Sequence, residues 1–120
     1  PSLYSEMVWE ARKRRAIKTS RSIDWIVMRN RLTSLDAKNK RRVADRLEEL
    51  SQRIGFRLAA GFGERVIYRE LFPKGLTLLD LGEGVADFKM TMSHLAARQE
   101  VRALLAELKL PGLEDQAIAV

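Results

Sequence analysis

The spacing of apolar and polar residues along the chain predicts helices that alternate with short strands. A first helix is expected over residues 2–18, with Ser2 as its cap and an apolar stripe that starts at Leu3. The polar residues 19–22 end this helix. The continuous apolar run 25–28 comes next, and we expect it to be a strand buried on both faces, as in a parallel sheet.

A second helix is expected over residues 36–54, with Asp36 as its N-cap and Gly55 as the residue that ends it. Residues 56–58 form the next short apolar run and are expected to be the second strand. The apolar stripe of the helix consists of Val43, Leu47, Leu50 and Ile54.

The pattern is weaker in the third quarter of the chain. Residues 64–72 are expected to be a short helix that Pro73 and Gly75 end. Residues 76–81 are expected to be extended or to form a third strand. Loops are expected at 61–63 and 82–87.

A last helix is expected to begin at Ser93 as its cap and to end at Pro111 and Gly112. Its polar face carries both signs of charge, which favours a helix that faces a core over one that lies on a membrane. The order of elements then argues for an α/β fold with a parallel sheet and right-handed crossovers. We expect the buried stripe of this helix to consist of Ala97, Val101, Leu104, Leu105 and Leu108.

Composition narrows the class of protein. The chain has 120 residues, of which 46% are apolar and 32% charged, so we expect one folded domain. It has no cysteine and one histidine, which excludes disulfide scaffolds, thiolate metal sites and multi-histidine sites. No apolar run approaches the ~18–20 residues that cross a bilayer, and no signal peptide is recognisable. Because the first residue is Pro1, we expect a processed product or a fragment of a longer protein.

Positive charge is concentrated in the first half of the chain. Residues 1–57 hold 15 basic and 7 acidic residues, a net of +8, whereas the remainder holds 7 and 9, a net of −2. Three clusters carry this charge, at 12–15, 29–31 and 38–42. Each cluster alone could be a solvated helix face, but three of them favour an anionic partner.

The start of the second helix is the most informative cluster. Cations in the first two turns oppose the positive end of the helix dipole, at roughly 0.3–1 kcal/mol each when exposed. Free backbone N–H groups together with cations suit a phosphate backbone, and Lys38 and Arg42 share one helix face. Asp36 and Asp45 could instead offset the charge locally, and the pattern implies no sequence-specific base contact. The four cations are Lys38, Lys40, Arg41 and Arg42.

Residues 28–31 follow the first expected strand, and open α/β sheets bind ligands at the carboxyl ends of their strands. Asn30 could pair with the edge of a purine, and Arg31 could stack or bind phosphate. Taken alone, a polar strand end explains these two residues better.

The remaining residues that could carry chemistry are better explained by structural roles. We expect His94 to cap or pack the last helix, and Asp80 to be structural because no base or nucleophile is identifiable beside it. The glycine pairs at 61–63 and 82–84 are expected to be turns. No lysine follows a glycine anywhere in the chain, so a Walker A loop is excluded from it.

Longer blocks of sequence carry a family resemblance. They read DWIVMRNRL at 24–32, NKRR at 39–42, RVIYRELFP at 65–73, GLTLLDL at 75–81 and HLAARQE at 94–100, with PSLYS at 1–5 and VWE at 8–10. With these blocks, nearly all of residues 1–110 resemble the C-terminal half of the MipZ-type division-plane positioning ATPases. Those proteins belong to the ParA/MinD group of deviant Walker A P-loop ATPases.

The resemblance implies a fold and a function. The fold would be the C-terminal half of a P-loop ATPase domain over residues 1–112, in a three-layer arrangement of a mostly parallel sheet flanked by helices. The residue pattern itself predicts that 113–120 form a flexible tail. The parent protein would use ATP and Mg²⁺, form an ATP-gated homodimer, bind DNA without sequence preference, associate with a ParB-like partitioning protein and inhibit FtsZ polymerisation. It would lie in the bacterial cytoplasm, on the nucleoid.

The resemblance also limits the chemistry of this chain. The family's phosphate loop, switch aspartates and Mg²⁺ ligand lie in its N-terminal half, so no catalytic and no metal-binding residue is assigned here. We expect no ATP hydrolysis by this chain alone and no tight nucleotide binding. Asn30 matches the asparagine that faces the adenine in the family, and Arg31 is its neighbour in that motif.

The resemblance places the DNA-binding face as well. Lys38 and Arg42 match basic positions of that face, the positions that the dipole argument also selects. Where a relative carries a further basic residue, this chain has Gly63, so part of the DNA contact could be missing or shifted to Arg65. Lys40 and Arg41 complete the candidate set.

Two interpretations from other classes stay open: a stand-alone basic module that binds nucleic acid without a nucleotide, and a structural half-domain with solvated charges. A G-x-x-x-x-G-K-[ST] motif in the reading frame upstream of Pro1 would favour the ATPase. Half of an α/β domain exposes a sheet edge and one face, so we also expect the isolated chain to self-associate.

Overall fold

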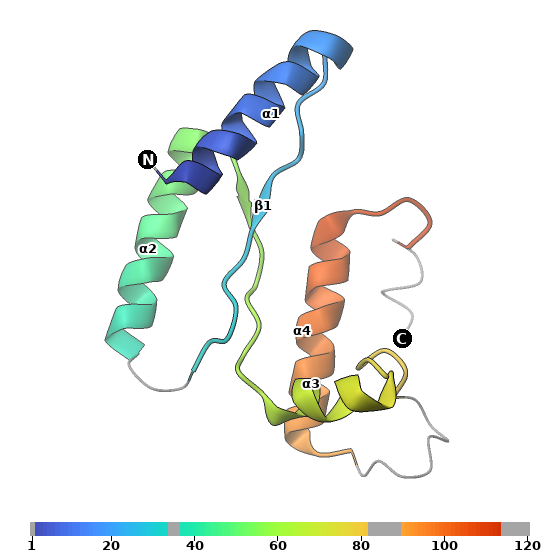
Figure 1. Cartoon of the computed structure of the whole chain (residues 1–120). Helices are drawn as coiled ribbons and strands as arrows, with labels where there is room; N and C mark the ends of the chain where they lie inside the picture. The colour runs from blue at the N-terminus through green and yellow to red at the C-terminus, as the bar shows by residue number, and fades with distance from the viewer. Residues whose placement is uncertain (1, 34–36, 82–89, 114–120) are drawn as a thin grey trace.

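The structure is a computed structural model that describes residues 2–33, 37–81 and 90–113 (Figure 1). Within these ranges it is a mixed α/β fold with two strands, which run parallel. In Figure 1, α1 and α2 lie on one side of the strands, and α3 and α4 lie on the other. The elements are α1 (Leu3–Thr19), β1 (Ile26–Val27), α2 (Ala37–Ile54), β2 (Arg57–Leu58), α3 (Val66–Leu71), the 3₁₀ helix η1 (Phe72–Lys74) and α4 (Met92–Leu108).

The ends of α1 and α2 follow the expected capping chemistry. The Ser2 hydroxyl accepts a hydrogen bond from the backbone N–H of Ser5, so Ser2 is the cap of α1 as expected. Ser20 adopts the left-handed conformation and ends α1. Gly55 has a φ of +80°, and its N–H donates to the Ser51 carbonyl at 2.8 Å, so it ends α2 as expected.

The two strands confirm the expected parallel pairing but not the expected burial. Ile26 is in register with Arg57, and Val27 with Leu58. Both strands are only half-buried. A sheet of two strands has a free edge along each of them, so neither strand is enclosed in the way that a central strand of a larger sheet is.

Arginine side chains join neighbouring elements of the fold. Arg12 of α1 donates to the Ile54 carbonyl at the end of α2, at 3.1 Å. Arg57 of β2 forms ion pairs with Asp24 and with Glu107 of α4, both at 2.6 Å. Arg12 therefore joins α1 to α2, and Arg57 joins β2 to α4 and to the segment before β1.

The buried core lies between α3, the segment after η1, and α4. It includes Ala97, which is the one residue of the expected buried stripe of α4 that is fully buried, whereas Leu108 of that stripe is about 38% exposed. Tyr68, Leu76 and Val101 pack against the core. Its buried members are Ile67, Leu71, Leu78, Leu81 and Ala97.

The expected third strand is wrong. Residues 77–80 form a turn, because the N–H and the hydroxyl of Thr77 both donate to the Asp80 carboxylate, at 2.7 and 2.8 Å. The turn sends Leu78 and Leu81 into the core, so the apolar residues of this segment are buried without a strand. Asp80 is structural, as expected, and these two bonds from Thr77 lower the pKa of its carboxyl.

Three boundaries also differ from the expectation. Thr91, not Ser93, is the N-cap of α4, and His94 completes a capping box by accepting from the Thr91 N–H, as its expected capping role requires. The helix ends at Leu108, before Pro111. Pro73 does not end α3 but lies inside η1, since proline tolerates the first positions of a helical turn.

Some expectations lie outside the described residues. These are the Asp36 cap, the loop at 82–87 with its glycine pair, and residues 114–120 of the expected tail.

Candidate functional site

The segments that follow β1 and β2 stay side by side beyond the strands themselves. The Phe62 N–H donates to the Arg29 carbonyl at 3.0 Å, and the Leu32 N–H donates to the Phe62 carbonyl at 2.8 Å. Gly61 permits this approach, because a Cβ there would lie 2.5 Å from the Arg29 oxygen. The carboxyl ends of both strands therefore form one edge, as the parallel arrangement predicted.

A cleft opens at this edge. The rings of Phe62 and Tyr68 lie 5.9 Å apart at its wall. Arg31 has a φ of +54°, and its N–H donates to the side-chain oxygen of Asn30 at 2.9 Å, so the asparagine holds the turn. An amide, two aromatic rings and several cations can together recognise a base and an attached phosphate. The lining consists of Asn30, Arg31, Phe62, Gly63, Glu64, Arg65, Tyr68 and Arg69.

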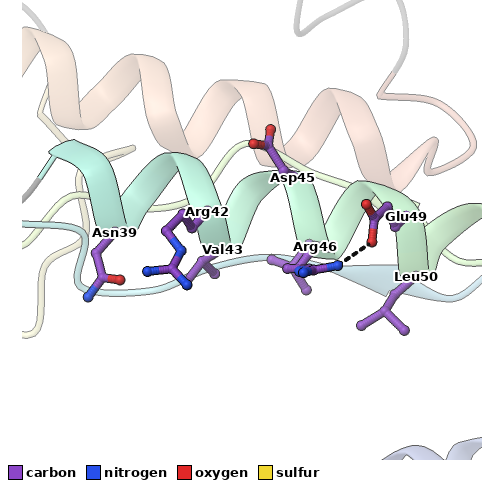
Figure 2. A pocket seen from close by; sticks show the side chains of 8 residues that line it. Asn39, Arg42, Val43, Asp45, Arg46, Glu49 and Leu50 are labelled. Carbon is purple, nitrogen blue, oxygen red and sulfur yellow. Dashed lines mark hydrogen bonds and ion pairs between the residues drawn. The ribbon is translucent and has the colours of Figure 1, made fainter.

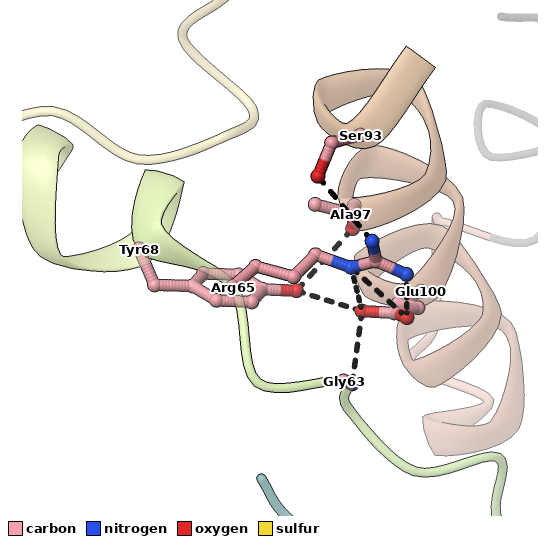
Figure 3. Close-up of polar contacts among 6 residues, drawn as sticks. All are labelled: Gly63, Arg65, Tyr68, Ser93, Ala97 and Glu100. Atoms are coloured by element: carbon pink, nitrogen blue, oxygen red, sulfur yellow. Dashed lines mark hydrogen bonds and ion pairs between the residues drawn. The ribbon is translucent and has the colours of Figure 1, made fainter. Parts of the chain in front are cut away.

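One wall of the cleft is anchored by a carboxylate from α4 (Figure 3). Glu100 forms an ion pair with Arg65 at 2.8 Å and accepts from the Tyr68 hydroxyl at 3.1 Å and from the Gly63 N–H at 3.3 Å. Arg65 also donates to the Ser93 hydroxyl at 3.4 Å. The loop after β2, the start of α3 and the middle of α4 are thus joined at one side chain.

The ionisation of this cluster follows from its burial and its hydrogen bonds. Burial raises the pKa of the Tyr68 hydroxyl to about 12, and its hydrogen bond to Glu100 acts in the same direction. Burial alone would raise the pKa of Glu100, but the bonds from Arg65, Tyr68 and Gly63 overcome it and lower the pKa. Glu100 is therefore a carboxylate, and Tyr68 is its donor.

A second ion pair crosses the mouth of the cleft. The Arg31 guanidinium lies 2.9 Å from the Glu64 carboxylate and lowers the pKa of that carboxyl. Arg31 stays about 76% exposed, so the pair is solvated and contributes little to stability. Its cation is accessible to a ligand.

The start of α2 presents its cations to solvent. Lys38, Arg41 and Arg42 are exposed, and none of their side chains has a hydrogen bond or an ion pair with another residue of the described ranges. The first turn of α2 holds no acidic residue. Acidic neighbours on the described part of α2 therefore do not pair with these three cations, and the one ion pair within the helix joins Arg46 to Glu49.

Lys40 belongs to the first turn of α2 and lies beside the segments that follow β1 and β2. It is half-buried, and its carbonyl accepts from the Arg29 guanidinium at 3.1 Å. Its side chain lines one shallow depression with Arg31 and another with Arg65. The structure thus brings Asn30, Arg31, Lys40 and Arg65 together, while Lys38, Arg41 and Arg42 lie outward on α2.

Arg65 has a structural role that the sequence did not suggest. Its side chain is about 25% exposed, and its guanidinium is held by Glu100. A Cβ at Gly63 would lie 3.2 Å from the Glu100 carboxylate, so a larger residue there would press on this pair. Arg65 is therefore less available to a phosphate than Arg31 is.

Sequence reasoning did not select Phe62, Tyr68, Arg69 or Glu100. The two rings could have been found from their place in the loop and the helix that follow β2. Glu100 could not, because it lies 37 residues from Gly63 along the chain.

Two further kinds of feature are absent from the described residues. In those ranges, His, Cys, Asp and Glu side chains form no group of three that could hold a metal ion. None of the helices in the same ranges has the length and apolar character to cross a membrane.

The comparisons with known proteins point to one family. The family model described as ATPase MipZ matches residues 1–112 of the chain. No curated protein matches the chain.

Proposed function

The chain belongs to the MipZ family of ATPases, and from that premise we propose that it forms the adenine-facing and DNA-facing part of a nucleotide-gated ATPase that positions the division plane. Use of a nucleotide and Mg²⁺ follows for the parent protein from its family. Residues 1–112 would form the C-terminal half of a three-layer P-loop domain, with its helices on both faces of a larger parallel sheet, and 113–120 would be a tail.

Asn30 and Arg31 would face the nucleotide. The cleft beside them supports this, since Phe62 and Tyr68 offer ring faces or edges to a base. The Asn30 oxygen is used by the Arg31 N–H, which leaves its NH₂ group to donate to a ring nitrogen of adenine. The printed sequence holds no G-x-x-x-x-G-K-[ST] loop, so this chain alone would bind ATP weakly.

Lys38 and Arg42 would contact the DNA backbone, with Arg41 beside them. Their exposure and the lack of an acid in the first turn support this role. Dimerisation in the ATP state would bring two such faces together, so that two weak contacts gain avidity. Lys40 and Arg65 would contribute less, because Lys40 is half-buried and Arg65 is paired.

The remaining partners are proposed from the family alone. The ATPase would associate with a ParB-like partitioning protein. The dimer of the ATPase would inhibit FtsZ polymerisation away from the division plane. The protein would then be cytoplasmic and nucleoid-associated.

The observation that carries the proposal is the family match over residues 1–112 together with a cleft at the strand ends lined by Asn30 and Arg31. ATP titration of the ¹⁵N-labelled chain, followed by NMR, tests it and tolerates weak binding. We expect ATP to cause saturable chemical-shift changes in the amides of residues 30–32 and 62–65, and GTP to cause smaller ones. In Asn30→Ala, the changes with ATP and with GTP should both be lost. Shifts of equal size with inorganic triphosphate would mean that the base is not recognised.

The second candidate is a basic module that binds nucleic acid without a nucleotide. The exposed cations of α2 favour it, since they need no nucleotide to be presented. If duplex DNA binds the chain while ATP leaves the shifts at 30–32 and 62–65 unmoved, this second candidate replaces the first.

A further inference from the structure

A single carboxylate lines the cleft at the strand ends. Among the residues that line this cleft in the described part of the chain, Glu64 is the one acidic residue. Its carboxylate lies 2.9 Å from the Arg31 guanidinium, and the hydrogen bond from Arg31 lowers the pKa of the carboxyl, so Glu64 is an ionised acceptor. The two residues lie 33 positions apart in the chain, so the pair depends on the approach of the segments that follow β1 and β2.

The Asn30 side chain does not by itself distinguish the two purines. Its oxygen accepts from the Arg31 N–H at 2.9 Å, and its NH₂ group is a donor that either base can use. N1 of adenine and O6 of guanine are both acceptors on the same edge of the ring system. Selection between the bases therefore has to come from another group of the cleft.

The purines differ in the rest of that edge. Guanine carries two adjacent donors, N1–H and the N2 amine, and one carboxylate can accept from both. Adenine has an unprotonated N1, which accepts a hydrogen bond from a guanidinium and is repelled by a carboxylate. An uncovered Glu64 would therefore favour guanine, whereas a Glu64 that is paired with Arg31 favours adenine.

We propose that the pair of Arg31 and Glu64 sets the preference of the cleft for adenine, and that Arg31 masks a carboxylate that would otherwise bind guanine. This inference rests on the proposed nucleotide site. Arg31 is about 76% exposed and keeps further N–H groups that can donate to N1 of adenine. Because the pair is solvated, its removal costs little stability, and variants of the two residues should fold.

The ratio of two dissociation constants tests the role of Arg31. ATP and GTP carry the same triphosphate, so this ratio reports the base alone. Arg31→Gly removes the guanidinium and suits the φ of +54° at this position. In NMR titrations of the ¹⁵N-labelled chain, the dissociation constant for GTP divided by that for ATP should exceed one, and it should fall at least about fivefold in Arg31→Gly. Arg31→Lys keeps a cation beside Glu64 and should retain the preference for ATP.

A second substitution identifies the acceptor for guanine. Arg31→Gly/Glu64→Gln replaces the uncovered carboxylate with an uncharged amide that has one oxygen, so most of the gain in GTP binding should be lost. Glu64→Gln alone should keep the preference for ATP, because Arg31 remains. A gain in GTP binding that persists in the double variant overturns the assignment to Glu64.

The chain offers a matched control in a second ion pair. Arg46 pairs with Glu49 at 3.0 Å and is about 78% exposed, but both residues belong to α2 and lie outside the cleft (Figure 2). Arg46→Ala should therefore leave both dissociation constants unchanged. Arg69→Ala removes another cation from the cleft itself, so it should weaken ATP and GTP binding equally and keep their ratio.

The outcomes separate this inference from the function on which it rests. If the chain binds neither nucleotide saturably, the proposed nucleotide site is wrong and the role of Arg31 is overturned with it. If the chain prefers ATP and Arg31→Gly keeps the same ratio, the nucleotide site stands and only the masking role of Arg31 is overturned. Equal affinities for ATP and GTP before any substitution also overturn the masking role.

Discussion

The Arg65 guanidinium lies 2.8 Å from the Glu100 carboxylate and joins the start of α3 to the middle of α4. Both side chains are about three-quarters buried. The pair therefore holds one wall of the candidate cleft in place, because Gly63 and Tyr68 bond to the same carboxylate.

Glu100→Gln should reduce the free energy of unfolding by about 1–2 kcal/mol, because the variant leaves a partly buried guanidinium without its counter-charge. Urea unfolding measures the loss. Glu10→Gln removes the exposed ion pair with Lys13 and should change stability by less than about 0.5 kcal/mol. Equal effects of the two substitutions would mean that the Glu100 cluster contributes no more than a surface pair.

The lowered pKa of Glu100 gives this contribution a pH dependence. The carboxylate's contribution is present above the ordinary glutamate pKa of 4.5 and is lost as the pH falls below it through the lower folded value. Thermal melts between pH 7 and pH 3 should show stability falling in acid, and less steeply in Glu100→Gln. An identical acid profile for the two proteins would contradict the assignment.

Gly61→Ala should destabilise the chain by about 1–3 kcal/mol, because the new Cβ would lie 2.5 Å from the Arg29 carbonyl and 2.8 Å from the Leu32 side chain. Gly75→Ala meets no atom within 4 Å but has a φ of +67°, so it should cost only about 1 kcal/mol. Chemical denaturation measures which of the two variants loses more stability. A larger loss in Gly75→Ala than in Gly61→Ala would show that the segments after β1 and β2 do not approach in this way.

Thr91→Ala should cost about 1 kcal/mol, since the Thr91 hydroxyl caps α4 by accepting from the His94 N–H. Ser93→Ala should cost less than about 0.5 kcal/mol, because Ser93 lies inside the helix and has only a long contact with Arg65. Circular dichroism and thermal melts compare the variants. A larger loss in Ser93→Ala would restore Ser93 as the cap.

Helical periodicity was a reliable guide to α1, α2 and α4, because each places apolar residues on one stripe over several turns. The strands at Ile26–Val27 and Arg57–Leu58 were also predicted from short apolar runs. The third strand was wrong because an apolar run also fits a turn whose leucines enter a core. Only the hydrogen bonds between Thr77 and Asp80 distinguish the turn from a strand.

The candidate site was predictable only in part. The cations of α2 could be placed from the helix pattern, and Asn30 from its position after a strand. The cleft depends on contacts between residues that are far apart in the chain, above all those of Glu100 with Gly63 and Tyr68. No local pattern contains that information.

The duplex DNA affinity of Lys38→Ala/Arg42→Ala tests the DNA-facing surface most directly. The matched control is Arg14→Ala/Lys18→Ala, which removes two exposed cations with the same spacing from α1. We predict that the α2 variant binds about tenfold more weakly at low salt and that its log–log salt slope falls by about 1.8, whereas the control keeps both values. Equal losses in the two variants, or none in either, would contradict the assignment of the DNA-facing surface to the start of α2.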